Sequence, residues 1–150
     1  MTPLEAVRSY YDSLAPGHRA RLMALLDPHI VLEIPEGFPG GGRTYVGLKA
    51  YIEEFLYSFY GAFDLKVLPE EFLDAGENVV ALGRFEGRAL STGVAVNVPF
   101  AHIWTVRESR LVRGRMFTDT AVLCAALTGR PAALTSCHAP TSGDREEKKA

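Results

Sequence analysis

The apolar residues of this chain change their spacing near residue 61, and this change limits the folds that the chain can form. Before that point, apolar side chains recur about every three or four residues, as they do along one face of a helix. After it, they alternate with polar ones over several extended runs, as is typical of strands. Helices gathered first and strands gathered later predict an α+β fold rather than a doubly wound parallel sheet.

Three helices are expected in the first part of the chain. Residues 2–5 read Thr-Pro-Leu-Glu, a capping box with proline at the first helical position, and helical apolar spacing continues beyond them. A second, short helix carries the apolar residues 22–26, and Asp27-Pro28 ends it. A strand follows over residues 30–34, and a third helix covers about residues 48–61.

Four strands are expected in the second part, because short turn signals separate four extended runs. Such a series predicts an antiparallel meander. Pro69 interrupts the first run and indicates an edge strand or a bulge. The expected strands cover residues 65–73, 78–88, 93–106 and 110–119, and a last helix covers residues 120–127.

Residues 35–47 hold five glycines and two prolines. A long loop of this composition in a small domain is expected to be mobile and to lie over a binding site. Its glycines match neither the dinucleotide-binding nor the P-loop spacing, so the loop is not expected to hold a phosphate group.

Composition and spacing exclude several classes of function. Sixteen Lys and Arg against eighteen Asp and Glu give no basic excess, so we expect no nucleic-acid partner. The longest apolar run, residues 121–127, is far shorter than the roughly 20 residues that span a bilayer, and no signal peptide is evident. A soluble, cytoplasmic protein without a membrane partner is therefore expected.

The two cysteines and four histidines show no metal-binding spacing. Neither a metal nor another cofactor is therefore expected, and a disulfide between Cys124 and Cys137 is not expected in a reducing cytosol. Near its end the sequence consists mainly of small, polar and charged residues. We expect one domain over residues 1–130 and a flexible polar tail over residues 131–150.

Several segments resemble known proteins. Residues 7–10, 25–31 and 45–47 resemble the nuclear-transport-factor-like superfamily, which includes the ketosteroid isomerases. Residues 99–107, followed by residues 117–120, are similar to its SnoaL-like group of polyketide cyclases and isomerase-related proteins. The resemblance covers about residues 3–128. It implies a cystatin-like cone, in which a curved antiparallel sheet wraps around three N-terminal helices, with a short C-terminal helix and an apolar pocket.

The steroid isomerases provide a test of function. Their oxyanion tyrosine matches Tyr10, but their general-base aspartate matches Ile34 and their protonated oxyanion aspartate matches Ala101. Isoleucine and alanine cannot exchange protons. Steroid isomerisation by that set of residues is therefore excluded.

Three residues remain candidates for catalysis, each with a structural alternative. Tyr10 either donates a hydrogen bond to a substrate carbonyl oxygen or is a core aromatic. The resemblance makes Asp119 a general acid or base, whereas its position also suits an N-cap of the last helix. His102 either moves a proton or points to the outer surface of the sheet.

The resemblance also implies what lines the pocket. This lining is apolar with few polar groups, which suits a small hydrophobic, polyketide- or terpenoid-like ligand. We expect a cofactor-independent cyclase, isomerase or hydratase, or alternatively a non-catalytic binding protein. A homodimer is expected through the outer sheet face, where Trp104 and Phe117 are predicted to lie. The expected lining residues are Tyr10, Leu32, Ile34, Phe55, Phe59, Ala101, Ile103, Met116 and Thr118.

Overall fold

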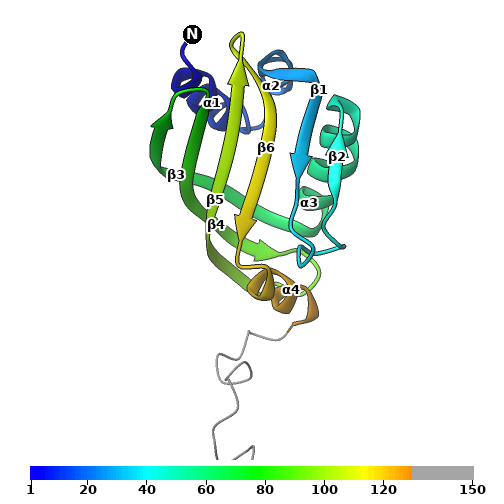
Figure 1. The fold of residues 1–150 in the computed structure, drawn as a ribbon. Coiled ribbons are helices and arrows are strands. Elements are labelled where there is room, and N and C mark those ends of the chain that lie inside the picture. Colours follow the sequence, from blue (N-terminus) through cyan, green and yellow to red (C-terminus); the bar gives the residue numbers. More distant parts are fainter. Residues whose placement is uncertain (130–150) are drawn as a thin grey trace, which may run out of the picture.

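A curved six-stranded sheet forms the frame of the computed structural model, which describes residues 1–129 (Figure 1). The predicted tail over residues 131–150 lies outside the described residues. The strand order is β2-β1-β6-β5-β4-β3. The strands are β1 (Leu26–Glu33), β2 (Thr44–Val46), β3 (Phe63–Ala75), β4 (Asn78–Ala89), β5 (Ala95–Arg107) and β6 (Arg110–Thr118).

The helices pack behind this sheet, and the last one lies at the end where β6 stops (Figure 1). None of those in the described part of the chain is long and apolar enough to cross a membrane. They are α1 (Pro3–Asp12), α2 (Arg19–Leu25), the π-helical segment η1 (Ala50–Leu56), α3 (Tyr57–Ala62) and α4 (Thr120–Thr128). The predicted single-domain α+β fold, with helices first and a meander later, is confirmed.

The sheet is mixed, which corrects the expectation of a purely antiparallel one. Strands β3 to β6 form the predicted antiparallel meander, but β1 pairs with β6 in parallel, with Leu32 opposite Gly114. The meander fixes the direction of β6, and β1 adds to its free edge from a distant part of the chain. Strand β2 lies within the expected loop, where β-branched and aromatic residues allow pairing with β1.

A bulge between β3 and β4 helps these long strands to bend over the helices. The β3–β4 register shifts between Pro69 and Glu71, and Gly83 lies opposite this bulge. A Cβ on Gly83 would lie 2.2 Å from the carbonyl oxygen of Leu68, so only glycine fits there. Bulges of this kind increase strand bending. The resulting concave face can wrap around an aromatic core.

Helix α1 begins with the predicted capping box. The Glu5 amide donates to Thr2 Oγ1 at 3.2 Å, and the Thr2 amide donates to Glu5 Oε2 at 2.7 Å. The helix then buries Val7, Tyr10 and Tyr11 against the sheet. Both tyrosines are thereby fixed on the concave side of the molecule.

Candidate functional site

A narrow cavity lies between the helices and the concave face of the sheet. The space in it that is open to the centre of a water molecule is about 20 Å³, which corresponds to about one ordered water. Its walls are almost entirely aromatic and aliphatic. They are formed by Tyr10, Tyr11, Leu14, Phe38, Phe55, Leu56, Phe59, Tyr60, Val67, Phe85, His102, Met116 and Thr118.

The structure brings some of the predicted site residues to this cavity and leaves others elsewhere. Leu32 and Ile34 are buried but do not line it, and Ala101, Ile103 and Asp119 lie outside it. Those that line it are Tyr10, Phe55, Phe59, His102, Met116 and Thr118.

Strand β5 presents the opposite face from the one expected. His102 and Trp104 are buried on the concave side, whereas Ala101 and Ile103 are half-buried on the outer side. A shift of one residue relative to the isomerase match moves every side chain of a strand to the other face. The wide indole of Trp104 fits inside because the neighbouring residue is Gly114, where a Cβ would come within 2.5 Å of the indole ring.

Asp119 caps helix α4 instead of facing the cavity. Its Oδ1 accepts from the amide of Val122 at 3.3 Å, and the residue is exposed. The extended chain of β6 ends at Thr118, so Asp119 is the first residue free to turn into the helix. Of the two alternatives for this residue, the structure shows the N-cap.

A chain of hydrogen bonds fixes His102. The hydroxyl of Tyr11 lies 2.7 Å from Nδ1 of His102, and Nε1 of Trp104 donates to the same hydroxyl oxygen at 2.9 Å. Because Trp104 can only donate, the arrangement that satisfies all three groups has the Tyr11 hydroxyl donating to Nδ1. The imidazole proton then resides on Nε2.

Burial keeps this imidazole neutral. Removal from water lowers the pKa of His102 from its ordinary value of 6.5 to about 3, because no water solvates the charged form. Within the described residues, Nε2 of His102 is the one buried side-chain nitrogen or oxygen without a hydrogen-bond partner. A buried donor without a partner is costly, and an oxygen atom in the cavity, of a ligand or of a water molecule, would satisfy it.

A second polar group comes from two tyrosines. The hydroxyls of Tyr10 and Tyr51 share a hydrogen bond. Burial raises the pKa of both, so each remains a neutral phenol. Neither Tyr51 nor Tyr11 was predicted as a site residue. The signal for Tyr51 is its i, i+4 spacing to Phe55, whereas Tyr11 was predicted only as part of the apolar face of the first helix.

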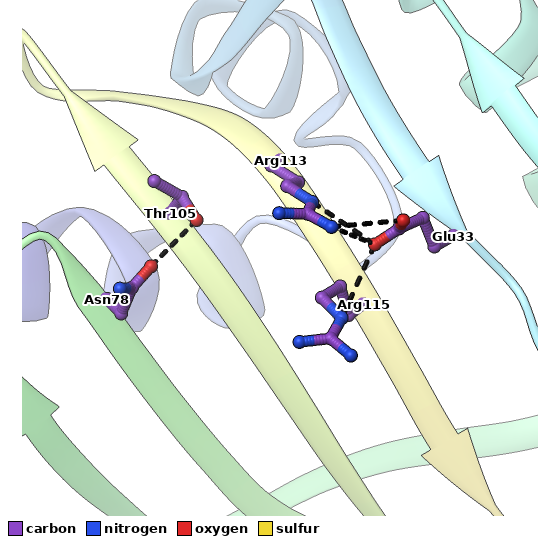
Figure 2. A network of polar contacts seen from close by, with 5 residues as sticks. All are labelled: Glu33, Asn78, Thr105, Arg113 and Arg115. Atoms are coloured by element: carbon purple, nitrogen blue, oxygen red, sulfur yellow. Dashed lines mark hydrogen bonds and ion pairs between the residues drawn. The ribbon is translucent and has the colours of Figure 1, made fainter.

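A cluster of charged residues lies on the outer face of the sheet, away from the cavity. Figure 2 shows Glu33 between Arg113 and Arg115, with Asn78 and Thr105 bonded nearby. Nη2 of Arg113 lies 2.8 Å from a Glu33 oxygen, and Nε of Arg115 lies 3.4 Å from it. These partly exposed pairs line the outer surface and contribute little to stability.

No metal-ligating cluster forms within residues 1–129. No group of three or more His, Cys, Asp and Glu side chains in this range lies close enough to hold an ion. None of the described residues that line the cavity is Asp, Glu, Lys or Arg. The cavity therefore presents donors of neutral hydrogen bonds and apolar surface.

Comparison with known proteins places this geometry in context. A family model described as the SnoaL-like domain matches residues 7–114. No curated protein matches the chain at a significant level.

Several solved structures are similar to the chain. A nuclear-transport-factor-like protein of Burkholderia thailandensis shares 26% identity over 85% of this chain and 98% of that one, with a TM-score of 0.78. TerC, crystallised with polyporic acid, shares 26% identity over 84% of this chain and 98% of its own, with a TM-score of 0.74. A Jannaschia protein named for a SnoaL-like polyketide cyclase is 23% identical over 86% and 93%, with a TM-score of 0.72, which supports the fold alone.

Proposed function

Because this chain belongs to the SnoaL-like domain family, as its local sequence predicted, we propose that it is a cofactor-independent enzyme of the cyclase, isomerase or hydratase type. Its proposed substrate is a hydrophobic, polyketide- or terpenoid-like carbonyl compound. One observation carries the proposal: His102 lines an apolar cavity with a buried, unpartnered Nε2. The crystal structure of TerC with polyporic acid supports it, because a similar chain accepts a small molecule.

The proposed chemistry is stabilisation of charge on a substrate oxygen. The hydrogen on Nε2 of His102 donates to a substrate carbonyl oxygen and stabilises the partial negative charge on that oxygen when the carbonyl group is polarised. Since the pKa of His102 is about 3, the ring stays neutral near physiological pH. Tyr10 is proposed as a second donor: when the Tyr51 hydroxyl donates to Tyr10, the phenolic hydrogen of Tyr10 is left for a ligand in the cavity that Tyr10 lines.

A second candidate function is binding without chemistry. The specific observation that favours it is the lack of a carboxylate or an amine among the described cavity residues, because such groups commonly act as bases. Asp119, proposed from the resemblance as general acid or base, is engaged at the N-cap of α4. The two candidates differ in whether a bound ligand is converted.

Mass spectrometry distinguishes these candidates. Native spectra of freshly purified protein identify any released small molecule, which is then incubated with the protein beside a panel of hydrophobic ketones. Loss of one oxyanion donor typically lowers turnover by about 10²–10³, so we expect His102→Phe to lose at least about a hundredfold. His29→Phe is the matched control, because His29 is exposed and does not line the cavity.

The outcomes separate clearly. If the turnover of His102→Phe stays within a few-fold of the parent's turnover, the proposed role of His102 is contradicted. A ligand recovered unchanged, bound about twofold to tenfold more weakly by His102→Phe, favours the binding protein, since one neutral hydrogen bond contributes about 0.5–1.5 kcal/mol.

The assembly state and location belong to the same proposal. We place the proposed enzyme in the cytoplasm as a homodimer. The outer face of the sheet supports a dimer contact, because Phe117 is 44% exposed there and Ala101 and Ile103 are only half-buried. Trp104, which the sequence placed on this face, lies inside instead.

A further inference from the structure

A second hollow lies along the free edge of strand β3, where helix α1 ends. The space open to the centre of a water molecule is about 700 Å³ in this cleft, against about 20 Å³ in the cavity. Its walls come from the end of α1 and the following turn, from α3, from the first half of β3, and from the turn after β4. They are Tyr11, Leu14, Ala15, Pro16, Tyr60, Phe63, Asp64, Leu65, Lys66, Val67, Leu68 and Leu90.

The cleft and the cavity share a wall. Tyr11, Leu14, Tyr60 and Val67 line both of them. Tyr11 is also the residue whose hydroxyl bonds to His102. One wall of the cleft is therefore formed by side chains that also line the cavity around His102.

Some of the apolar residues that line the cleft are exposed to solvent. Leu68 is 38% exposed and Leu90 is 50% exposed, and both line the cleft. Exposed large apolar residues gathered in one hollow are typical of a binding surface. The charged residues of this wall, Asp64 and Lys66, are exposed, and Asp64 lies 3.9 Å from Arg88.

We propose that the cleft is a second binding subsite for the same ligand, whose oxygen-bearing end reaches His102. This inference rests on the proposed function and deepens it. The cavity has room for little more than one small group, whereas the cleft has room for a much larger apolar body. The substrate class is then an elongated, uncharged ketone with a hydrophobic tail.

Alkyl phenyl ketones of increasing chain length, from acetophenone to decanophenone, test this subsite with the full-length protein. The only tryptophan of the chain, Trp104, packs 4.6 Å from the ring of Tyr10 and reports binding through its fluorescence. We expect affinity to rise about twofold per added methylene until the cleft is filled, as half-burial of each methylene predicts.

Two matched variants on β3 locate the tail. Leu68→Glu is expected to weaken decanophenone binding at least about tenfold, because a charge in the cleft opposes burial of the tail. Leu73→Glu is the control, since Leu73 is 45% exposed on the same strand and does not line the cleft. Leu90→Glu repeats the test from another wall residue.

The results distinguish the subsite from the proposed function. If acetophenone binds through His102 but the affinity of the ketones does not depend on chain length, the subsite alone is overturned. Equal losses of decanophenone affinity in Leu68→Glu and Leu73→Glu also overturn it. Acetophenone bound equally well by the parent and His102→Phe counts against the proposed role of His102, while a length dependence abolished by Leu68→Glu still supports the subsite. Failure of every ketone to bind overturns both.

Discussion

The imidazole of His102 stacks on Phe100, with ring centroids 4.0 Å apart, and bonds to the hydroxyl of Tyr11. No charged side chain of residues 1–129 shares this environment, so protonation of the ring gains no partner there and loses the solvation of water. The pKa of His102 is lowered to about 3 for this reason. The same burial that suits a neutral donor therefore makes folding sensitive to acid.

Stability is expected to fall with pH because of His102. In the unfolded chain this residue titrates near 6.5, whereas in the folded protein its pKa is about 3. Between these two pH values the ring is protonated in the unfolded state and neutral in the folded state. The contribution of His102 to stability is therefore complete above pH 6.5 and declines as the pH falls toward 3. At pH 5 the loss is about 2 kcal/mol relative to pH 8.

Urea unfolding of the parent and of His102→Phe at pH 5 and pH 8 measures this loss. All other groups titrate in both proteins, so the difference between the two pH dependences isolates His102. The variant is expected to lose about 2 kcal/mol less than the parent on acidification. Parallel pH dependences would contradict the assignment of a neutral, buried His102.

Single residues were predictable where one face of an element is clearly apolar. Phe55 and Phe59 follow helical spacing, and the structure places both in the cavity wall. Strand β5 differs because Ala101 and Ile103 on one face and Trp104 on the other are all apolar. Alternation then identifies a strand without saying which face is buried, and packing around Gly114 decides it.

At the scale of elements, the glycine-rich loop closes one side of the cavity. Phe38 packs between Phe55 and Phe59, with ring centroids 5.7 and 5.6 Å away. The loop folds back on itself because the Gly42 amide donates to the Glu36 carbonyl at 3.2 Å. This turn is tight, so the loop depends on a residue without a side chain at its centre.

Gly42→Ala is expected to displace this loop. Its Cβ would lie 1.6 Å from the carbonyl oxygen of Pro35, a contact that the backbone must relieve by moving. We expect a loss of about 1–3 kcal/mol in the free energy of unfolding, together with altered ketone affinity as Phe38 shifts. Gly61→Ala is the control, because no heavy atom lies within 4 Å of its added Cβ and alanine favours the helix by up to about 1 kcal/mol. Equal stability of the two variants would contradict this account.

The elements themselves were largely predictable, while their pairing was not. Local signals placed α1, the four strands of the meander and α4 close to their observed bounds. The parallel pairing of β1 with β6 joins segments about eighty residues apart, and no local pattern encodes it. The three-residue strand β2 forms only because β1 offers a free edge beside it.

At the scale of the whole molecule, the curved sheet has one face that is covered by helices and one face that is exposed to solvent. The concave face is filled by aromatic side chains, whereas the outer face carries half-buried Leu82, Ala101 and Ile103 beside exposed Phe117. Cross-strand pairing brings Leu82, Ala101 and Phe117 into one row. A row of this kind on an otherwise polar surface favours association with a second copy.

Phe117→Glu is therefore expected to convert a dimer into a monomer. The substitution puts a carboxylate at the β6 end of the apolar row, where burial in an interface costs several kcal/mol unless the charge is paired. Sedimentation velocity at micromolar concentration measures the change, and Met23→Glu is the control because Met23 is exposed on helix α2. A parent protein that sediments as a monomer contradicts the proposed dimer, and a Phe117→Glu dimer moves the interface to another surface. Since none of Leu82, Ala101 and Phe117 lines the cavity, ketone binding is expected to survive dissociation.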